Sequence, residues 1–240
     1  PHIATGVEVS QVCQFAPSET SGATPKFDCV FEGGEVLKVK YGKNPEIHSE
    51  AAATRLLAAL GFGADHIYLV RTLRCFGCPP DPHQAQEGVA PDAGSFVDFQ
   101  GVAVERRLPG QAIEGDGGDE GWDWEDLYEA QATGRGSNRA QRDALRLMAV
   151  LLNNWDSRSD NQRLLCLPEG YPPGRGGHCG KALAYMHDVG GTFGRVGGGS
   201  KDERKLDVEG WTAVPIWQDR SSCTVRIKSP RLHHATFGEA

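Results

Sequence analysis

The sequence EVLKVKYGKNPEIHSEAAATRLLAAL, residues 35–60, decides the fold. Apolar and charged residues alternate at its start, which is typical of a β-strand and places Lys38 and Lys40 on the same strand face. Residues 46–60 have the apolar spacing of a helix, which Gly61 ends. The stretch therefore predicts a strand that carries two lysines and is followed by a helix.

Glu50 lies on the apolar side of that expected helix. Helical spacing aligns it with three apolar positions, Ala53, Leu57 and Leu60. Because burying an unpaired charge is costly, a carboxylate on this side needs a cationic partner. We predict that one of the two strand lysines supplies it, while the alternative that these lysines are solvated edge residues stays open here.

The flanking segments extend this pattern into a β-rich region with one helix. Strand patterns lie at 5–15, in a hairpin over 27–41, at 66–75 and at 99–107. The hairpin is expected to turn at Glu32-Gly33-Gly34, and residues 16–26 form a loop. Asn44, before Pro45, and Ser49 are the candidate N-terminal caps of the helix.

The second half of the chain has a different composition. Helices are expected at 122–132 and 138–154, and strands at 161–167 and 182–189, with irregular structure from 200 onward. Ala144, Leu147 and Leu151 have core spacing in the second helix, and Trp122 and Trp124 are expected to anchor the first one in the core.

Composition limits the class of protein. The 240 residues include 31 glycines and 14 prolines, which indicates a globular chain with many loops. The net charge of −7, from 25 basic and 32 acidic residues, argues against a nucleic-acid partner. No apolar run approaches the roughly 18 residues of a transmembrane helix, so no transmembrane segment is predicted.

The seven cysteines leave two interpretations open. Cys75 and Cys78 form one CxxC, and a zinc site made from this pair with Cys166 and either His178 or Cys179 is conceivable. Cys166 and Cys179 also flank a loop that a disulfide between them would close. Disulfides would indicate an oxidising environment, so an extracytoplasmic or secreted location is slightly favoured over a cytoplasmic one.

Two polar motifs follow the long helix. NWDSRSDN, residues 154–161, places Asp156 and Asn161 five positions apart, and HDVGG, residues 187–191, places Asp188 at the end of an apolar strand. Carboxylate and amide oxygens of this kind can bind a hard cation or accept a hydroxyl proton. Ordinary Asx-rich turns are the alternative interpretation of both motifs.

The order of these motifs resembles the protein-kinase-like superfamily: a strand lysine, a glutamate on the next helix, D-x4-N after a long helix, and then D-x-G. The resemblance covers about residues 20–195. It is to the atypical branches, namely the HipA-like, phosphoinositide-kinase-like and secreted Golgi-type kinases, and to uncharacterised bacterial kinase-like proteins. It implies an α+β fold of two lobes, with a β-rich N-lobe over 1–108 and a reduced, mainly helical C-lobe over 109–240.

The resemblance also implies catalytic roles. Lys40, or Lys38 on the same face, would bind the nucleotide phosphates, and Glu50 would hold that lysine. Asp156 would accept or orient the proton of the substrate hydroxyl, and Arg158 would neutralise the transferred phosphoryl group.

The remaining implied roles concern the cofactors, ATP and Mg²⁺ or Mn²⁺. Asn161 and Asp188 would bind the metal. The loop 18–27 would cover the phosphates through Ser21, Gly22 and Thr24. Glu105 would belong to the hinge that holds adenine.

The chain is thus expected to be an atypical kinase that phosphorylates a hydroxyl of an unidentified acceptor. Two alternatives keep the same fold: a pseudokinase-type nucleotide-binding or scaffold module, and a nucleotidyl transferase that transfers AMP. A third, from another class, is a metal-dependent phosphodiesterase that uses Asp156, Asp160, His187 and Asp188.

Overall fold

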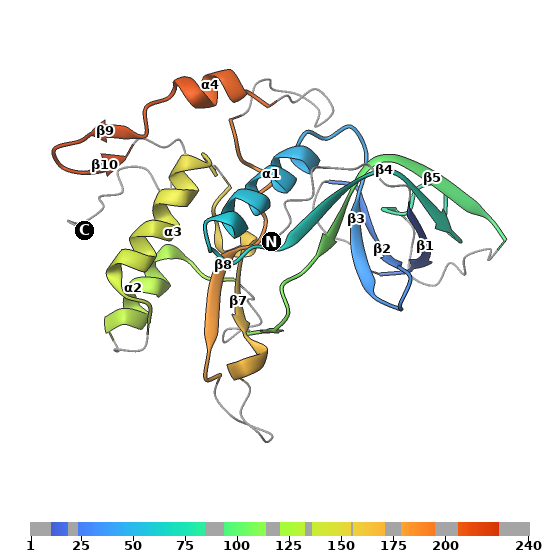
Figure 1. Ribbon diagram of the computed structural model, residues 1–240, viewed down its shortest axis with the longest axis horizontal. Coiled ribbons are helices and arrows are strands. Elements are labelled where there is room, and N and C mark those ends of the chain that lie inside the picture. The colour runs from blue at the N-terminus through green and yellow to red at the C-terminus, as the bar shows by residue number, and fades with distance from the viewer. Residues whose placement is uncertain are drawn as a thin grey trace.

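A computed structural model of the chain describes residues 11–18, 24–84, 94–113, 121–132, 136–154, 156–170, 179–194 and 206–225. These residues form a mixed α+β structure with a closed five-stranded barrel, a three-stranded sheet and a two-stranded sheet. In Figure 1 the barrel lies on the right, helices α2 and α3 on the left, and α1 with the β7–β8 hairpin in the middle of the view. The mixed α+β class is as predicted.

The barrel comprises the first five strands in the order β1-β2-β3-β5-β4. They are β1 (Gln11–Ala16), β2 (Lys26–Val30), β3 (Val36–Lys40), β4 (His66–Phe76) and β5 (Phe96–Arg106). A parallel pairing of β1 with β4 closes the barrel, whereas the other pairs are antiparallel. The predicted hairpin is confirmed: Gly33 and Gly34, with φ of 93° and 84°, occupy backbone conformations that glycine adopts readily.

Helix α1 (Glu46–Ala59) crosses from the barrel to the second half of the chain. Ile47 and Ala51 pack on barrel residues, whereas Ala53 and Leu57 join the core that contains α3. Leu60, expected on the inward side, is 55% exposed. Leu60 follows the last helical residue and has φ −91° and ψ 3°. Because it lies outside the helix, helical spacing does not place its side chain on the buried face.

Of the two candidate caps of α1, only Asn44 acts at the start of the helix. Its side-chain oxygen accepts a hydrogen bond from the backbone N–H of Glu46 at 3.0 Å. Pro45 occupies the cap position itself. Ser49 lies inside the helix, so its assignment as a cap is wrong.

The second half contains both sheets and helices. The three-stranded sheet has the order β6-β7-β8, and β9 and β10 form the two-stranded sheet. The elements are β6 (Gln111–Ala112), α2 (Trp124–Ala132), α3 (Arg139–Leu151), β7 (Gln162–Cys166), β8 (Ala182–Met186), α4 (Val208–Ala213), β9 (Trp217–Asp219) and β10 (Thr224–Val225). The predicted boundary at residue 108 falls between β5 and β6, and the division into two lobes stays a prediction.

Helix α3 starts with a capping box between Asn138 and Gln141, but its core face differs from the expected one. Five apolar residues of α3 and its C-terminal cap are buried in the core: Leu145, Met148, Ala149, Val150 and Leu152. Leu147 and Leu151 are only partly buried, at the edge of that core. The buried face is displaced because it packs with Trp122 and Trp124, which are buried as predicted.

Six cysteines form three disulfides in the structure, and Cys223 is free. The pairs are Cys13–Cys29, Cys75–Cys78 and the predicted Cys166–Cys179. The zinc set that would mix the second and third pairs is therefore wrong, because each pair is bonded within itself; His178 lies outside the described residues.

Within the described ranges, no helix has both the length and the apolar character needed to cross a membrane.

Candidate functional site

The centre of the site is a buried lysine at the end of β3. The Lys40 Nζ lies 2.6 Å from Glu50 Oε1 and 3.2 Å from Glu105 Oε2. The three side chains are 9%, 4% and 1% exposed. Strand alternation turns Lys40 to this face, α1 supplies Glu50, and β5 supplies Glu105, so three elements meet around one ammonium group.

The pKa values of Lys40, Glu50 and Glu105 are shifted in different ways. Burial by itself lowers the pKa of Lys40, but Glu50 and Glu105 outweigh it and raise the pKa, so the lysine stays charged. Burial raises the pKa of Glu50 to about 7, against the opposing effect of Lys40. Burial would also raise the pKa of Glu105, but the two lysines Lys40 and Lys38 hold it below its usual range. Glu105 therefore stays ionised, and Glu50 is the member that binds a proton near neutral pH.

Two further lysines face the same region. Lys38 Nζ is 4.0 Å from Glu105 Oε1, and Lys26 on β2 pairs in register with Lys40 on β3. Burial lowers the pKa of Lys26, as do the charges of Lys40 and Lys38. The sequence reasoning missed Lys26, although the hairpin turn centred on Gly33 places it opposite Lys40. Three cationic side chains on one face favour an anionic ligand.

The two predicted metal-binding residues lie next to each other. The backbone oxygen of Asn161 accepts hydrogen bonds from the backbone N–H groups of His187 and Asp188, both at 3.0 Å. Asp188 Oδ1 accepts a hydrogen bond from the Gly190 N–H at 3.1 Å. Burial would raise the pKa of Asp188, but Lys40 and the Gly190 N–H lower it, so its carboxylate is ionised. The structure thus places Asp188 within the electrostatic reach of Lys40.

The segment that carries Asp156 forms a tight turn beside these residues. The Asn161 side chain donates to the Asp156 backbone oxygen at 2.7 Å, and Arg158 Nε lies 3.1 Å from Asp156 Oδ1. Two tryptophans form hydrogen bonds with the turn and the strand that follows it. Trp124 donates to Ser157 Oγ on the turn at 3.1 Å, and Trp122 donates to the backbone oxygen of Arg163 on β7 at 3.0 Å.

Two contacts connect α1 with its surroundings at the site. Ser49 Oγ donates to the Gly190 backbone oxygen at 2.6 Å, which fastens α1 to the turn after Asp188. The Thr24 hydroxyl donates to Glu46 at 2.8 Å and accepts from Asn44 at 2.9 Å, so it is engaged at the start of α1. Its role in phosphate binding stays a prediction. Ser21 and Gly22 lie outside the described residues.

Asp65 organises a second polar group that sequence reasoning missed. Its carboxylate lies 2.6 Å from His187 Nδ1 and accepts hydrogen bonds from the Tyr185 hydroxyl at 3.2 Å and the Leu108 N–H at 2.7 Å. Burial raises the pKa of Tyr185. This group joins the start of β4, the end of β8 and the segment after β5. It holds the end of β5, which carries Glu105, close to the segment after β8 that carries Asp188.

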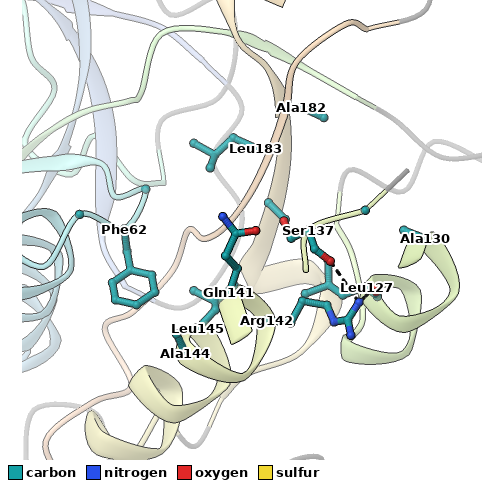
Figure 2. Close-up of a pocket in the computed structure, with 14 residues that line it drawn as sticks. Phe62, Leu127, Ala130, Ser137, Gln141, Arg142, Ala144, Leu145, Ala182 and Leu183 are labelled. Carbon is teal, nitrogen blue, oxygen red and sulfur yellow. Dashed lines mark hydrogen bonds between the residues drawn. The ribbon is translucent and has the colours of Figure 1, made fainter. Parts of the chain in front are cut away.

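Two of the cavities among the described residues, each of about 300 Å³, differ in chemistry. Figure 2 shows one that is mainly apolar, lined by Phe62, Leu127, Leu145 and Leu183, with Arg142 bonded to the backbone at its wall. It contains none of the predicted site residues. The other is lined by charged residues that include Lys38, Glu105 and Arg107, so it opens beside the lysine cluster.

Comparison with known proteins gives matches among solved structures. No family model and no curated protein sequence matches the chain. Among solved structures, the chain is similar to the crystal structure of a Helicobacter pylori proinflammatory kinase CtkA, with a TM-score of 0.43 and 13% sequence identity. The alignment covers 78% of this chain and 61% of that chain, so this chain spans about three fifths of the neighbour's length. At this TM-score we draw no functional conclusion from the similarity.

Proposed function

We propose that the chain is a phosphotransferase of kinase-like fold that transfers the γ-phosphoryl group of ATP to a hydroxyl group, with Mg²⁺ or Mn²⁺. The observation that carries the proposal is the buried Lys40–Glu50 pair, 2.6 Å apart, within electrostatic reach of the ionised Asp188. Phosphoryl transfer depends on positioning and electrostatic stabilisation rather than on a covalent protein intermediate, and these residues supply both.

The lysines would bind the phosphates. Glu50 fixes the direction of the Lys40 ammonium group, and Lys26 adds a second cation opposite it on the neighbouring strand. A lysine is a compact point charge with three donors, which suits contacts with several phosphate oxygens.

Asn161 and Asp188 would hold the divalent cation. Their donor set fits a hard metal, because one offers an amide oxygen and the other a carboxylate that stays ionised beside Lys40. The cation, when bound, would neutralise charge on the phosphates.

Asp156 and Arg158 would act on the acceptor side. Asp156 is partly exposed on its turn, so its carboxylate can accept the proton of an incoming hydroxyl. Arg158, which is paired with it, carries the positive charge that a developing phosphoryl transition state requires.

One observation favours a second candidate, a nucleotide-binding scaffold without catalysis. Glu105 lies 3.2 Å from Lys40 and stays ionised, so it competes with a phosphate for the same ammonium group. A site in which Lys40 remains held by two carboxylates could bind a ligand without aligning its γ-phosphate.

The test uses the whole chain with ATP and Mg²⁺ or Mn²⁺, and follows label from γ-labelled and α-labelled ATP in separate reactions. The acceptors are water and the chain itself. We expect γ-label transfer or ADP formation that Asp188→Asn lowers about 100-fold or more. Lys181→Met is the control variant, since that exposed lysine pairs with Glu169 and is none of the proposed site residues.

Four results separate the candidates. Turnover that Asp188→Asn leaves unchanged contradicts the proposal, and so does an absence of turnover. Metal-dependent ATP binding without turnover favours the scaffold. Transfer of α-label shows a nucleotidyl transferase.

A further inference from the structure

Asp65 is a buried carboxylate that the proposed catalytic steps do not use. It lies directly before β4, and its side chain is 1% exposed. Three groups from distant parts of the chain surround it: the Leu108 N–H at 2.7 Å, the Tyr185 hydroxyl at 3.2 Å and His187 Nδ1 at 2.6 Å. Because a buried carboxylate is costly unless its oxygens accept hydrogen bonds, Asp65 holds these three partners around itself.

The shortest of these contacts leads to Asp188, the proposed metal ligand. His187 is its neighbour in the chain, and the backbone N–H groups of both residues donate to the Asn161 backbone oxygen at 3.0 Å. Because a carboxylate only accepts hydrogen bonds, His187 Nδ1 carries the hydrogen of its contact with Asp65, and this contact fixes the orientation of the ring. Asp65 thus holds the residue at which the backbones of both proposed metal ligands meet.

The turn between α1 and β4 also packs closely on β8. A Cβ added at Gly63 would stand 2.9 Å from Leu183 Cδ2 and 3.0 Å from Tyr185 Cβ, so only a glycine allows this approach. The Tyr185 and His187 rings lie edge to face, with their centroids 6.1 Å apart. This packing keeps the turn that carries Asp65 at a fixed distance from β8.

A second side chain fixes the other side of Asp188. Ser49 Oγ, on α1, donates at 2.6 Å to the backbone oxygen of the residue two positions after Asp188. Ser49 directly precedes Glu50, which bonds to Lys40 at 2.6 Å. Asp65 and Ser49 belong to one stretch of chain, which comprises α1 and the turn before β4. This stretch therefore holds the segment around Asp188 at both ends and also orients Lys40.

We propose that Asp65 is a positioning residue, which orients the Asp188 carboxylate for the divalent cation through the ring of His187. This role rests on the metal-binding function proposed above for Asp188. Replacing a group that orients a metal ligand from outside typically costs about 10- to 100-fold in metal affinity. The loss of Asp65 therefore weakens the contribution of the cation to nucleotide binding, whereas binding of the nucleotide without metal stays nearly the same.

The experiment measures the dissociation constant of a non-hydrolysable ATP analogue from the whole chain, with and without Mn²⁺, by isothermal titration calorimetry. Asp65→Asn keeps the size of the buried side chain, and His187→Phe keeps the ring but removes Nδ1. Each should reduce the gain in affinity from Mn²⁺ about tenfold or more and change metal-free binding less than about twofold. Tyr185→Phe is the matched control, because it removes another donor to the same carboxylate but is not adjacent to Asp188. It should change both constants less than about twofold.

Circular dichroism of the same samples shows which variants fold. If one of the two test variants does not fold, the other decides; if neither folds, Asp65 serves folding alone and the proposal is overturned. An unchanged gain from Mn²⁺ overturns it, and so does an equal loss in metal-free binding or in Tyr185→Phe.

The same titrations separate this proposal from the proposed function. An original chain whose nucleotide affinity does not rise with Mn²⁺ overturns both the role of Asp65 and the metal site at Asp188. An original chain that gains affinity from Mn²⁺ but shows no ATP turnover contradicts the phosphotransferase function alone, and the titrations of the variants still decide the role of Asp65.

Discussion

Replacing Lys40 with methionine tests whether a buried ion pair organises the site. The Lys40 ammonium group lies 2.6 Å from Glu50 and 3.2 Å from Glu105, and methionine keeps most of the aliphatic length without the charge. Two buried carboxyl groups are then left without their central cation. Removing one partner of a buried pair costs about 3–5 kcal/mol of unfolding free energy.

The cost depends on pH, because a carboxyl group can bind a proton instead of remaining an unpaired anion. Burial raises the pKa of Glu50 to about 7 even with the lysine present, and without Lys40 the pKa of Glu105 rises as well. Stability falls by about 1.4 kcal/mol for each pH unit between the ordinary pKa of such a group in the unfolded chain and its raised pKa in the folded chain. The variant therefore binds more protons when folded than when unfolded, and its loss of stability should grow as the pH rises from 5.5 to 8.

Urea unfolding followed by circular dichroism at pH 5.5, 7 and 8 measures both effects. Lys38→Met is the matched control, since Lys38 lies on the same strand face but is 21% exposed and 4.0 Å from Glu105. Its loss should stay below about 1 kcal/mol and change little with pH. A loss below about 1 kcal/mol for Lys40→Met at pH 8, or a loss equal to that of Lys38→Met at every pH, would refute the reasoning.

Two other substitutions test neighbouring parts of the site. Burial raises the Glu50 pKa from 4.5 to about 7, so the contribution of Glu50 to stability is complete below pH 4.5 and is lost as the pH rises through about 7. In urea unfolding, Glu50→Gln should remove this decline in unfolding free energy between pH 5 and 8, which is on the order of 3 kcal/mol. The same dependence of unfolding free energy on pH in the variant and the original chain would contradict this. At Gly121 an added Cβ would overlap the Ser159 backbone oxygen. Gly121→Ala should therefore lower the unfolding free energy by about 2 kcal/mol or more and lower ATP turnover. An unchanged melting temperature and an unchanged turnover would contradict this.

The parts of the site that could be predicted are those that local periodicity determines. Lys40 and Glu50 are ten residues apart, and strand alternation followed by helical spacing is enough to bring them to one side. The same hairpin turn also places Lys26 opposite Lys40, so this third lysine could have been predicted from the sequence. The proposed roles of these residues stay predictions.

Contacts between distant segments could not be predicted. Asp65 and His187 are 122 positions apart, and no spacing rule connects the start of β4 with the end of β8. The buried side of helix α3 could not be predicted for the same reason. Apolar residues occur on more than one side of it, and the side that is buried packs in one core with Trp122 and Trp124.

The charge of the site bears on how a nucleotide would enter it. The three lysines Lys26, Lys38 and Lys40 face the anions Glu105 and Asp188, with Glu50 close to its titration point at neutral pH. Most of the positive charge is therefore already matched by buried carboxylates. A triphosphate would add several negative charges to this balanced group, which the lysines alone cannot compensate at low dielectric. We therefore expect the nucleotide and the divalent cation proposed at Asp188 to bind together, each raising the affinity for the other.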